Sequence, residues 1–312
     1  MKIVLVGASG FLGRHVLHAL GRAGHDCTVL TRDAARRREL ALLPGVRLVQ
    51  ADVHAPEVLD AQFRGADAVF SMAGILNERG RDGSGFRRVH VDLVQSLLAA
   101  ATRAGVRRVL HVSAIGAGQG ASHYLRSKGE AERLLEASPV AASVFRPSVV
   151  FGPGDSFFNR FAALLRLSPV LPLACPEARL QPVFAGDVAS AMVTVLARPA
   201  TSFEAFELGG PEVYSLRELV AWTAGQLGLQ RRIVGLSQGL SRLQGALMDF
   251  VPGKPFSSDN FLSLQSPNVA QGDPWSGWGL HPASIGTVVP SYLLRSARQQ
   301  RLADLRRHAG RL

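Results

Sequence analysis

The sequence has little cysteine and almost no lysine. Its 312 residues include two cysteines, Cys27 and Cys175, too few for a disulfide framework or a cysteine metal knuckle. The histidines show no metal-ligand spacing either, so we expect no bound metal. Of the 35 basic residues, only Lys2, Lys128 and Lys254 are lysines. A chain that uses arginine for most cations has kept lysine at position 128, and one reason is chemistry that needs a compact ammonium group.

Long apolar runs are also missing. No segment approaches the roughly 20 apolar residues that a membrane-spanning helix needs. Gly7 and Gly10 interrupt the apolar start too early for a signal-peptide core. With 47% hydrophobic and 19% charged residues, the composition is that of an ordered globular protein. We therefore expect a cytoplasmic protein, and two free cysteines fit a reducing compartment.

Acidic residues are outnumbered by basic ones. The net charge of +11 favours acidic partners such as phosphate-bearing cofactors, anionic lipids or nucleic acids. We expect no nucleic-acid binding, because helix-turn-helix, zinc-spacing and aromatic-interleaved basic signatures are all missing. From Arg295 onward six arginines stand against one acid, Asp304, with leucines at helical spacing. This predicts a basic C-terminal helix, which either packs on the protein or touches a membrane surface or an acidic partner.

The first half of the chain alternates short apolar segments with amphipathic ones. The pattern predicts helices near residues 12–22 and 87–103, and strands at residues 2–6, 26–31, 46–50, 66–71, 107–112 and 141–146. Such alternation predicts right-handed crossovers, and hence an α/β fold with a Rossmann-type, doubly wound parallel sheet. We assign residues 1–150 to this domain.

The rhythm changes after Val150, where glycine, proline and serine recur. Helices are still predicted, one near residues 187–198 and one near 216–227. The second opens with the capping box Ser215-Leu216-Arg217-Glu218. We expect residues 151–312 to complete the sheet and to form a smaller lid domain.

Three glycines join the first strand to the first helix, in Gly7-Ala8-Ser9-Gly10-Phe11-Leu12-Gly13. Each glycine removes a Cβ that would obstruct a tight turn, a pyrophosphate or the helix–sheet contact. The helix N-terminus then favours the negative pyrophosphate. A purely structural turn is the alternative, but a position between strand and helix favours a dinucleotide. The candidate cofactor residues of this turn are Gly7, Ser9, Gly10, Phe11, Leu12, Gly13 and Arg14.

The end of the second strand, Thr31-Arg32-Asp33, bears on which dinucleotide is bound. A carboxylate here binds the ribose of NAD and repels a 2′-phosphate, whereas an arginine does the opposite. Arg32, Arg14 and the arginines at 36–38 therefore predict a preference for NADP(H). NAD(H) stays open because Asp33 can reach the ribose instead. Two further pairs at strand ends complete the expected cofactor site: Asp52-Val53 and Ala73-Gly74.

Tyr124 and Lys128 lie one helical turn apart, so both side chains can point into one pocket. The alternative is a solvated helix face carrying a chance tyrosine and lysine. Ser113 follows the fifth strand, at the sheet edge where open α/β sheets bind ligands. It is a candidate contact to substrate, or it only ends the strand. His111, two residues earlier, is expected to be a buried supporting residue rather than a base.

Together these motifs resemble the extended or atypical short-chain dehydrogenase/reductase superfamily, whose members include epimerases and dehydratases. Residues 146–155 and 181–189 add to the match. Within the superfamily the chain is similar to the bacterial family related to the NADPH-binding accessory subunit of respiratory complex I. The segments that carry this similarity are residues 73–78, 124–128, 157–161 and 207–214.

The resemblance implies roles for individual residues. Tyr124 is the acid/base, and Lys128 with the cationic nicotinamide ring lowers its pKa. Lys128 also binds the nicotinamide ribose, Ser113 polarises the substrate, and Pro147 flanks the nicotinamide. These roles fit an NADP(H)-dependent oxidoreductase, epimerase or dehydratase acting on a carbonyl or hydroxyl group. The resemblance also allows an accessory protein that holds NADPH without turnover, peripheral to the inner membrane and in contact with a respiratory complex.

Overall fold

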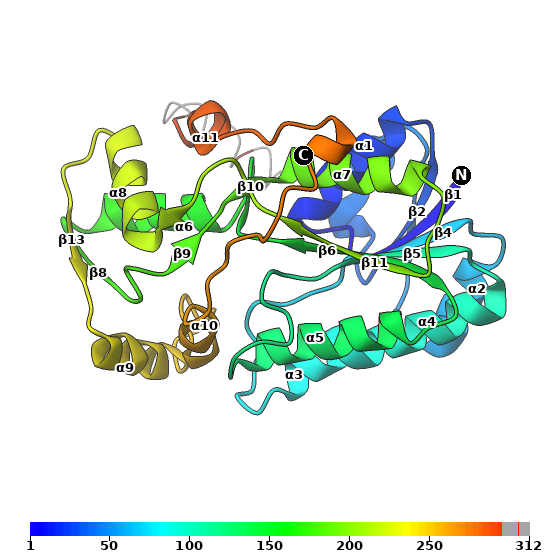
Figure 1. Ribbon diagram of the computed structural model, residues 1–312, viewed down its shortest axis with the longest axis horizontal. Coiled ribbons are helices and arrows are strands. Elements are labelled where there is room, and N and C mark those ends of the chain that lie inside the picture. Colours follow the sequence, from blue (N-terminus) through cyan, green and yellow to red (C-terminus); the bar gives the residue numbers. More distant parts are fainter. Residues whose placement is uncertain (295–304, 306–312) are drawn as a thin grey trace.

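A computed structural model describes residues 1–294 and residue 305. Seven strands form one parallel sheet in the order β11-β6-β5-β4-β1-β2-β3, with helices on both faces (Figure 1). The chain reverses its winding direction between β1 and β4, and such switch points bind ligands in open α/β sheets. The predicted fold class is confirmed. The basic helix expected from Arg295 onward lies outside the described residues.

The predicted strands of the first half are present within about two residues of their expected limits. Their bounds are β1 (Lys2–Val6), β2 (Asp26–Thr31), β3 (Val46–Gln50), β4 (Ala68–Ser71), β5 (Arg108–Val112) and β6 (Ala141–Pro147). The helical segments between them are α1 (Phe11–Arg22), η1 (Ala35–Leu42), α2 (Pro56–Phe63), α3 (Ser84–Phe86), η2 (Arg87–Asp92), α4 (Leu93–Ala104) and α5 (His123–Glu136). The helix predicted near residues 87–103 is not α-helical throughout, because its first part, η2, is a turn of π-helix.

The second half completes the sheet and adds a smaller group of elements with an apolar core of its own, which we name the lid. Strand β11 (Phe203–Leu208) pairs with β6 at the sheet edge, and α7 (Ala185–Ala197) packs against α1. The predicted capping box is present at the start of α8 (Leu216–Gln226), where Ser215 and Glu218 exchange hydrogen bonds. The other elements of the second half are β7 (Val150–Phe151), α6 (Phe157–Leu167), β8 (Val170–Leu173), β9 (Arg179–Leu180), β10 (Val183–Phe184), β12 (Tyr214–Ser215), β13 (Arg232–Gly235), α9 (Gln238–Met248), α10 (Ser258–Ser263), η3 (Ser276–Trp278) and α11 (Ile285–Leu293).

Apolar side chains form three cores. One lies on the sheet face covered by α1 and α7, and a second lies on the face covered by α2, α4 and α5. The third belongs to the lid and includes Phe151, Phe158 and Leu219. Cys27 is buried in the first core, as expected. The two sheet cores fix β1, β4 and β5, whose carboxyl ends carry the candidate site.

Within the described residues, the helices are all too short or too polar to cross a lipid bilayer.

Candidate active site

The glycine turn leaves no room for side chains at two of its three glycines. Gly7 has a φ of +84°, and a Cβ there would lie 2.3 Å from the backbone nitrogen of Ala73. A Cβ on Gly13 would lie 2.1 Å from the carbonyl oxygen of Ala8. Both contacts are with backbone, which cannot move aside. These two glycines therefore hold the turn against β4 and the first helix against the turn.

Gly10 differs, because the nearest atom to a Cβ there is 3.9 Å away. It is the N-cap of α1, with no side chain capping the helix and no acid in the first turn. The first N–H groups of a helix lack intrahelical partners and attract anions. This open cradle fits the pyrophosphate of a dinucleotide. Ser9, Phe11, Leu12 and Arg14 flank it, as their place in the sequence requires.

At the end of β2, Arg32 is exposed and Asp33 is hydrogen-bonded to a residue nearby in the sequence. The Asp33 carboxylate accepts a hydrogen bond of 3.0 Å from the backbone N–H of Arg36, at the start of η1. Arg14 is paired with Glu39 at 2.8 Å, so part of its expected charge is neutralised. Asp52 accepts from the N–H of His54 at the end of β3. Arg14 and Asp33 are thus both engaged within the protein, whereas Arg32 is exposed.

Helix α5 carries Tyr124 and Lys128, and it begins at Ser122, whose hydroxyl accepts from the N–H of Leu125. Lys128 is buried, and its Nζ donates to the carbonyl oxygen of Val112 at 3.0 Å. A Cβ on Gly74 would lie 3.5 Å from the same Nζ, so the loop after β4 meets the lysine. The structure therefore brings Gly74, Lys128 and the peptide before Ser113 together at one edge of the sheet.

Burial changes the acidity of both α5 groups. It lowers the pKa of Lys128 to about 8, with Glu132 opposing the shift. Burial raises the pKa of Tyr124 to about 12, and the Asp259 carboxylate adds to the rise. The sequence predicted a lowered tyrosine pKa from two positive groups, Lys128 and the nicotinamide ring. In the protein without a cofactor the pKa shift is upward, because burial disfavours the phenolate and the Asp259 carboxylate repels it. The lowered pKa expected for the cofactor complex stays a prediction.

His90 joins this cluster although the sequence did not single it out. Its Nε2 accepts from the backbone N–H of Ile75 at 3.1 Å, so the proton is on Nδ1. That nitrogen donates to the Ser127 hydroxyl at 2.8 Å, which in turn donates to the Tyr124 carbonyl. Burial, Lys128 and His111 lower the pKa of His90 to about 2, so it stays neutral.

The position of His90 in the π-helical turn η2 explains why periodicity did not reveal it. A π-turn shifts the register of a helix face by one residue, and such turns are frequent at functional sites. The ring of His90 meets that of Tyr124 edge-to-face, with ring centroids 5.6 Å apart. The sequence feature that could have revealed His90 was its place on the helix expected to follow the Ala73-Gly74 loop.

Three buried side-chain atoms in the described part of the chain have no hydrogen-bond partner. They are Ser113 Oγ, His111 Nε2 and Asn77 Oδ1. His111 is anchored by its other nitrogen, 3.0 Å from the Ser71 hydroxyl, and burial and Lys128 lower its pKa. An unmet buried polar group costs about 1–3 kcal/mol. Two of the three are at the carboxyl end of β5, where Ser113 was predicted to meet a substrate.

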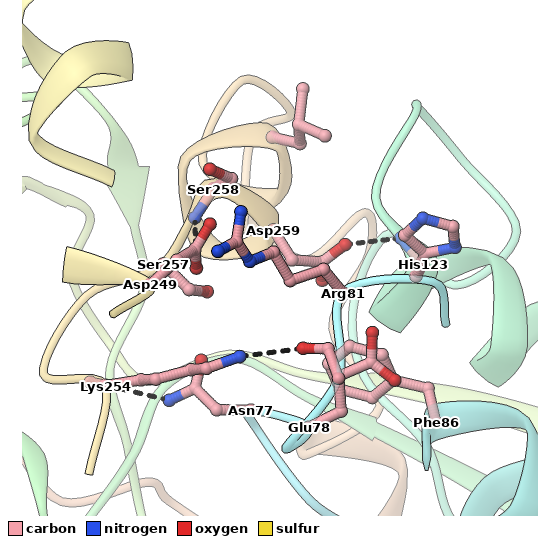
Figure 2. A pocket seen from close by; sticks show the side chains of 12 residues that line it. Asn77, Glu78, Arg81, Phe86, His123, Asp249, Lys254, Ser257, Ser258 and Asp259 are labelled. Carbon is pink, nitrogen blue, oxygen red and sulfur yellow. Dashed lines mark hydrogen bonds between the residues drawn. The ribbon is translucent and has the colours of Figure 1, made fainter. Parts of the chain in front are cut away.

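The third unmet atom belongs to Asn77, which lines a cavity of about 160 Å³ beside Tyr124. Figure 2 shows side chains from two distant segments facing each other across it, residues 77–86 and residues 249–262. Phe86 lines the cavity and also meets the Tyr124 ring, at 6.0 Å between centroids. Asp259 accepts from the N–H groups of His123 and Tyr124, which joins the lid to the start of α5.

A strand–glycine turn–helix cradle beside a half-buried tyrosine and a buried lysine defines a dinucleotide-binding protein of the Rossmann class. Comparison with known proteins then gives the family. A family model described as NAD(P)H-binding matches residues 7–153. The chain is 30% identical over 250 residues to a protein named ceramide reductase in Caulobacter vibrioides, covering 79% of this chain and 77% of that protein. The chain belongs to this NAD(P)H-binding family.

Other relatives span both expected kinds of function. The NADH dehydrogenase [ubiquinone] 1 alpha subcomplex subunit 9 of Dictyostelium discoideum is 28% identical over 219 residues, covering 69% of this chain and 60% of that subunit. This chain therefore spans less than two thirds of that relative. The dTDP-glucose 4,6-dehydratase of Streptomyces venezuelae, solved with NAD bound, superposes with a TM-score of 0.76 at 22% identity, covering 96% of this chain and 98% of that one. That likeness shows the fold.

Proposed function

We propose that the protein is an NADP(H)-dependent oxidoreductase acting on a carbonyl or hydroxyl group, with Tyr124, Lys128 and Ser113 as its catalytic residues. The observation that carries this proposal is the Ser113 hydroxyl, which is buried without a partner beside the peptide that Lys128 contacts. A hydrogen-bonding group left unmet in the protein alone is suited to the oxygen of a substrate. An epimerase or dehydratase would use the same three residues.

Each side chain has a separate task in this proposal. Ser113 Oγ donates to the substrate oxygen and polarises it. Tyr124 passes its phenolic proton to that oxygen during reduction and takes it back during oxidation. Lys128 lies between the Val112 carbonyl and Gly74, where its ammonium would bind a ribose hydroxyl and stabilise the phenolate. Pro147, Ala73 and Gly74 would flank the nicotinamide. The bound cofactor supplies or accepts the hydride.

Conservative variants test these tasks. Tyr124→Phe should reduce kcat by about 100-fold or more, because general acid–base catalysis contributes that much, while cofactor affinity changes little. Ser113→Ala should lower kcat/KM with a wild-type cofactor affinity. Lys128→Ala should weaken both binding and turnover. Candidate substrates include ceramide-type lipids, the class named for one relative. Full activity in Tyr124→Phe would exclude its catalytic role.

The preference for NADP(H) over NAD(H) is proposed from Arg32. Asp33 is held by the Arg36 N–H, which disfavours its use as a ribose ligand and leaves Arg32 for the 2′-phosphate. Titration should give a lower Kd for NADPH than for NADH. Arg32→Ala should weaken NADPH binding about tenfold or more, the size of one charged contact, and leave NADH binding unchanged. A ratio of Kd values that favours NADH would contradict the preference.

The relatives in complex I favour a second candidate, an accessory protein that holds NADPH without turnover. This function implies peripheral attachment to the inner membrane or to a respiratory complex. It predicts that a nucleotide co-purifies, that Tyr124→Phe retains biological activity, and that Lys128→Ala loses both nucleotide and activity. Membrane fractions washed at low and high salt test the attachment, because charge-driven contacts weaken with salt. Recovery of all the protein in the soluble fraction at low salt would count against this function.

A further inference from the structure

Helix α9 turns its apolar side outward. Leu240, Leu243 and Leu247 lie three and four residues apart, so they share one helix face. Phe250 and Val251 follow directly, and 44–73% of each of these five residues is exposed. We call this set the α9 ridge.

The opposite face of α9 is small and polar, and it is the face that packs on the protein. Its buried residues are Ser241 and Gly245, and a Cβ on Gly245 would lie 3.1 Å from the backbone of Ser257. Helices of soluble proteins ordinarily bury leucines and expose small or polar residues. The reversed pattern marks an interaction surface, since contiguous exposed apolar patches have this meaning in folded proteins.

Cations surround the α9 ridge. Arg242 is exposed on the helix itself, and the Arg81 guanidinium lies 3.9 Å above the centre of the Phe250 ring. Beyond Phe250, Lys254 donates to the Gly80 carbonyl and Arg160 donates to the Pro255 carbonyl, which places both at this end.

Two nearby acids, Asp249 and Asp82, accept hydrogen bonds within the protein, and Asp82 is exposed. Asp249 accepts from the N–H of Ser258, and Asp82 is bonded to Ser84. Positive charge therefore prevails around the α9 ridge, as it does over the whole chain, whose net charge is +11.

We propose that the α9 ridge docks the protein on an anionic lipid bilayer. The leucines and Phe250 would enter the boundary between headgroups and acyl chains while the surrounding cations meet lipid phosphates. A second copy of the chain fits this surface poorly, because it would bring Arg242 and Arg81 against like charges. The ridge is carried by a helix at the outer edge of the lid (Figure 1), where a flat and deformable surface can reach it. The proposal is independent of whether the protein turns over a substrate.

Vesicle flotation of the full chain tests this docking. The protein should bind vesicles of phosphatidylcholine with about 30% phosphatidylglycerol, and should bind pure phosphatidylcholine at least fivefold more weakly, since anionic lipid attracts basic segments. The double variant Leu243→Ser/Leu247→Ser should lower the partition coefficient on anionic vesicles more than tenfold, because two apolar side chains that would be buried in the bilayer are lost.

A matched control comes from Leu42, which is 84% exposed at the end of η1, far along the chain from α9. Leu42→Ser makes the same chemical change and should leave vesicle binding within twofold of wild type. Both variants should keep the wild-type melting temperature, because all three leucines are exposed.

Three results would overturn the proposal. They are absence of binding to anionic vesicles, binding that the double variant leaves unchanged, and a dimer in light scattering that the same variant dissociates. The second result would put any membrane contact elsewhere on the chain, and the third would assign the α9 ridge to a second copy.

Discussion

The glycine turn and the Tyr124–Lys128 side of the site serve one proposed cofactor, but they are built differently. The turn is one contiguous segment, residues 7–13, and backbone fills the space around Gly7 and Gly13. The tyrosine–lysine side is assembled from β5, η2, α5 and, through Asp259, the lid. Lys128, His111 and Ser113 are buried there, and one side-chain atom of each of the last two has no hydrogen-bond partner. The turn is therefore specified by shape, and the other side by charge and hydrogen bonding.

This difference implies opposite contributions to stability. A tight backbone turn that only glycine can form stabilises the fold and prepares the cofactor cradle at once. A buried ammonium and unmet hydrogen-bonding atoms cost free energy in the protein alone. Substitutions in the turn should therefore lose stability and binding together. Substitutions of the buried lysine and of the unmet groups should lose function while stability is retained or increased.

The largest expected effect is at Gly7. Gly7→Ala must place a methyl group within 2.3 Å of the Ala73 backbone at a φ of +84°. We expect it to lower the free energy of unfolding by about 3 kcal/mol or more, since overpacking and backbone strain add. Urea unfolding measures this, and cofactor affinity should fall with it.

Substitutions at two other glycines separate backbone strain from steric overlap and from loss of cofactor contact. Gly24 has a φ of +74° with no atom within 4 Å of a Cβ, so Gly24→Ala tests strain alone and should cost about 1 kcal/mol. Gly10→Ala meets neither obstacle in the protein and should leave stability within about 0.5 kcal/mol of wild type, yet weaken NADPH binding at least tenfold. Equal stability losses in all three variants would remove the distinction between shape and cofactor contact.

The two sides also differ in how far the sequence predicted them. The turn, the strand ends and the Tyr124–Lys128 pair are each local in sequence, so spacing alone located them. His90, Phe86 and Asp259 come together through long-range packing. A π-turn hides the first from helical periodicity, and the last lies in a segment rich in serine and proline. The upward shift of the Tyr124 pKa in the protein alone could not be predicted for the same reason, because both its burial and a carboxylate 135 residues away come from tertiary packing.

Lys128→Met should give the next largest effect, with stability and function moving in opposite directions. Burial lowers the pKa of Lys128 to about 8 from 10.5, so the unfolded chain binds the extra proton between these values. Stability then rises with pH across that window, and the full cost of the buried charge is present below pH 8. At pH 7 the variant should be more stable by roughly 1–3 kcal/mol, and the rise from pH 8 to 10 should disappear.

Urea unfolding at pH 7 and pH 10 checks this prediction. Lys2→Met is the control, since it removes an exposed lysine at the start of β1. A Lys128→Met protein that is less stable at pH 7 would show that the bond to Val112 outweighs desolvation, and the proposed opposition between the two sides would fail.

A smaller effect on stability is expected from His90 below pH 6.5. Its pKa falls from 6.5 to about 2, so below pH 6.5 the unfolded chain takes up a proton that the folded protein does not. Stability should decline by up to about 1.4 kcal/mol for each pH unit below 6.5. His90→Gln should remove this contribution and leave that of His111, whose pKa is also lowered. His18→Gln, a change at an exposed histidine of α1, should preserve both contributions. An unchanged slope in His90→Gln would mean that His90 can protonate in the folded state.

The smallest effect is expected for Asp259→Asn, which separates the charge of the Asp259 carboxylate from its size and packing. Asp259 accepts two backbone N–H groups at the start of α5, and its charge helps raise the pKa of Tyr124 to about 12. Asp259→Asn keeps the size and one acceptor, so stability should fall by only about 0.5–1 kcal/mol. The pKa of Tyr124 should move down, because one source of negative charge is gone and burial is unchanged.

Phenolate absorbance after rapid jumps to alkaline pH reports the Tyr124 pKa, with Tyr124→Phe identifying its signal among the three tyrosines. Asp249→Asn is the matched control, because Asp249 lines the same cavity and accepts from Ser258 instead of α5. A Tyr124 pKa that stays at about 12 in Asp259→Asn would show that burial alone sets it. The acid/base group would then depend on whatever displaces water from the pocket, and the lid carboxylate would act only as a helix cap.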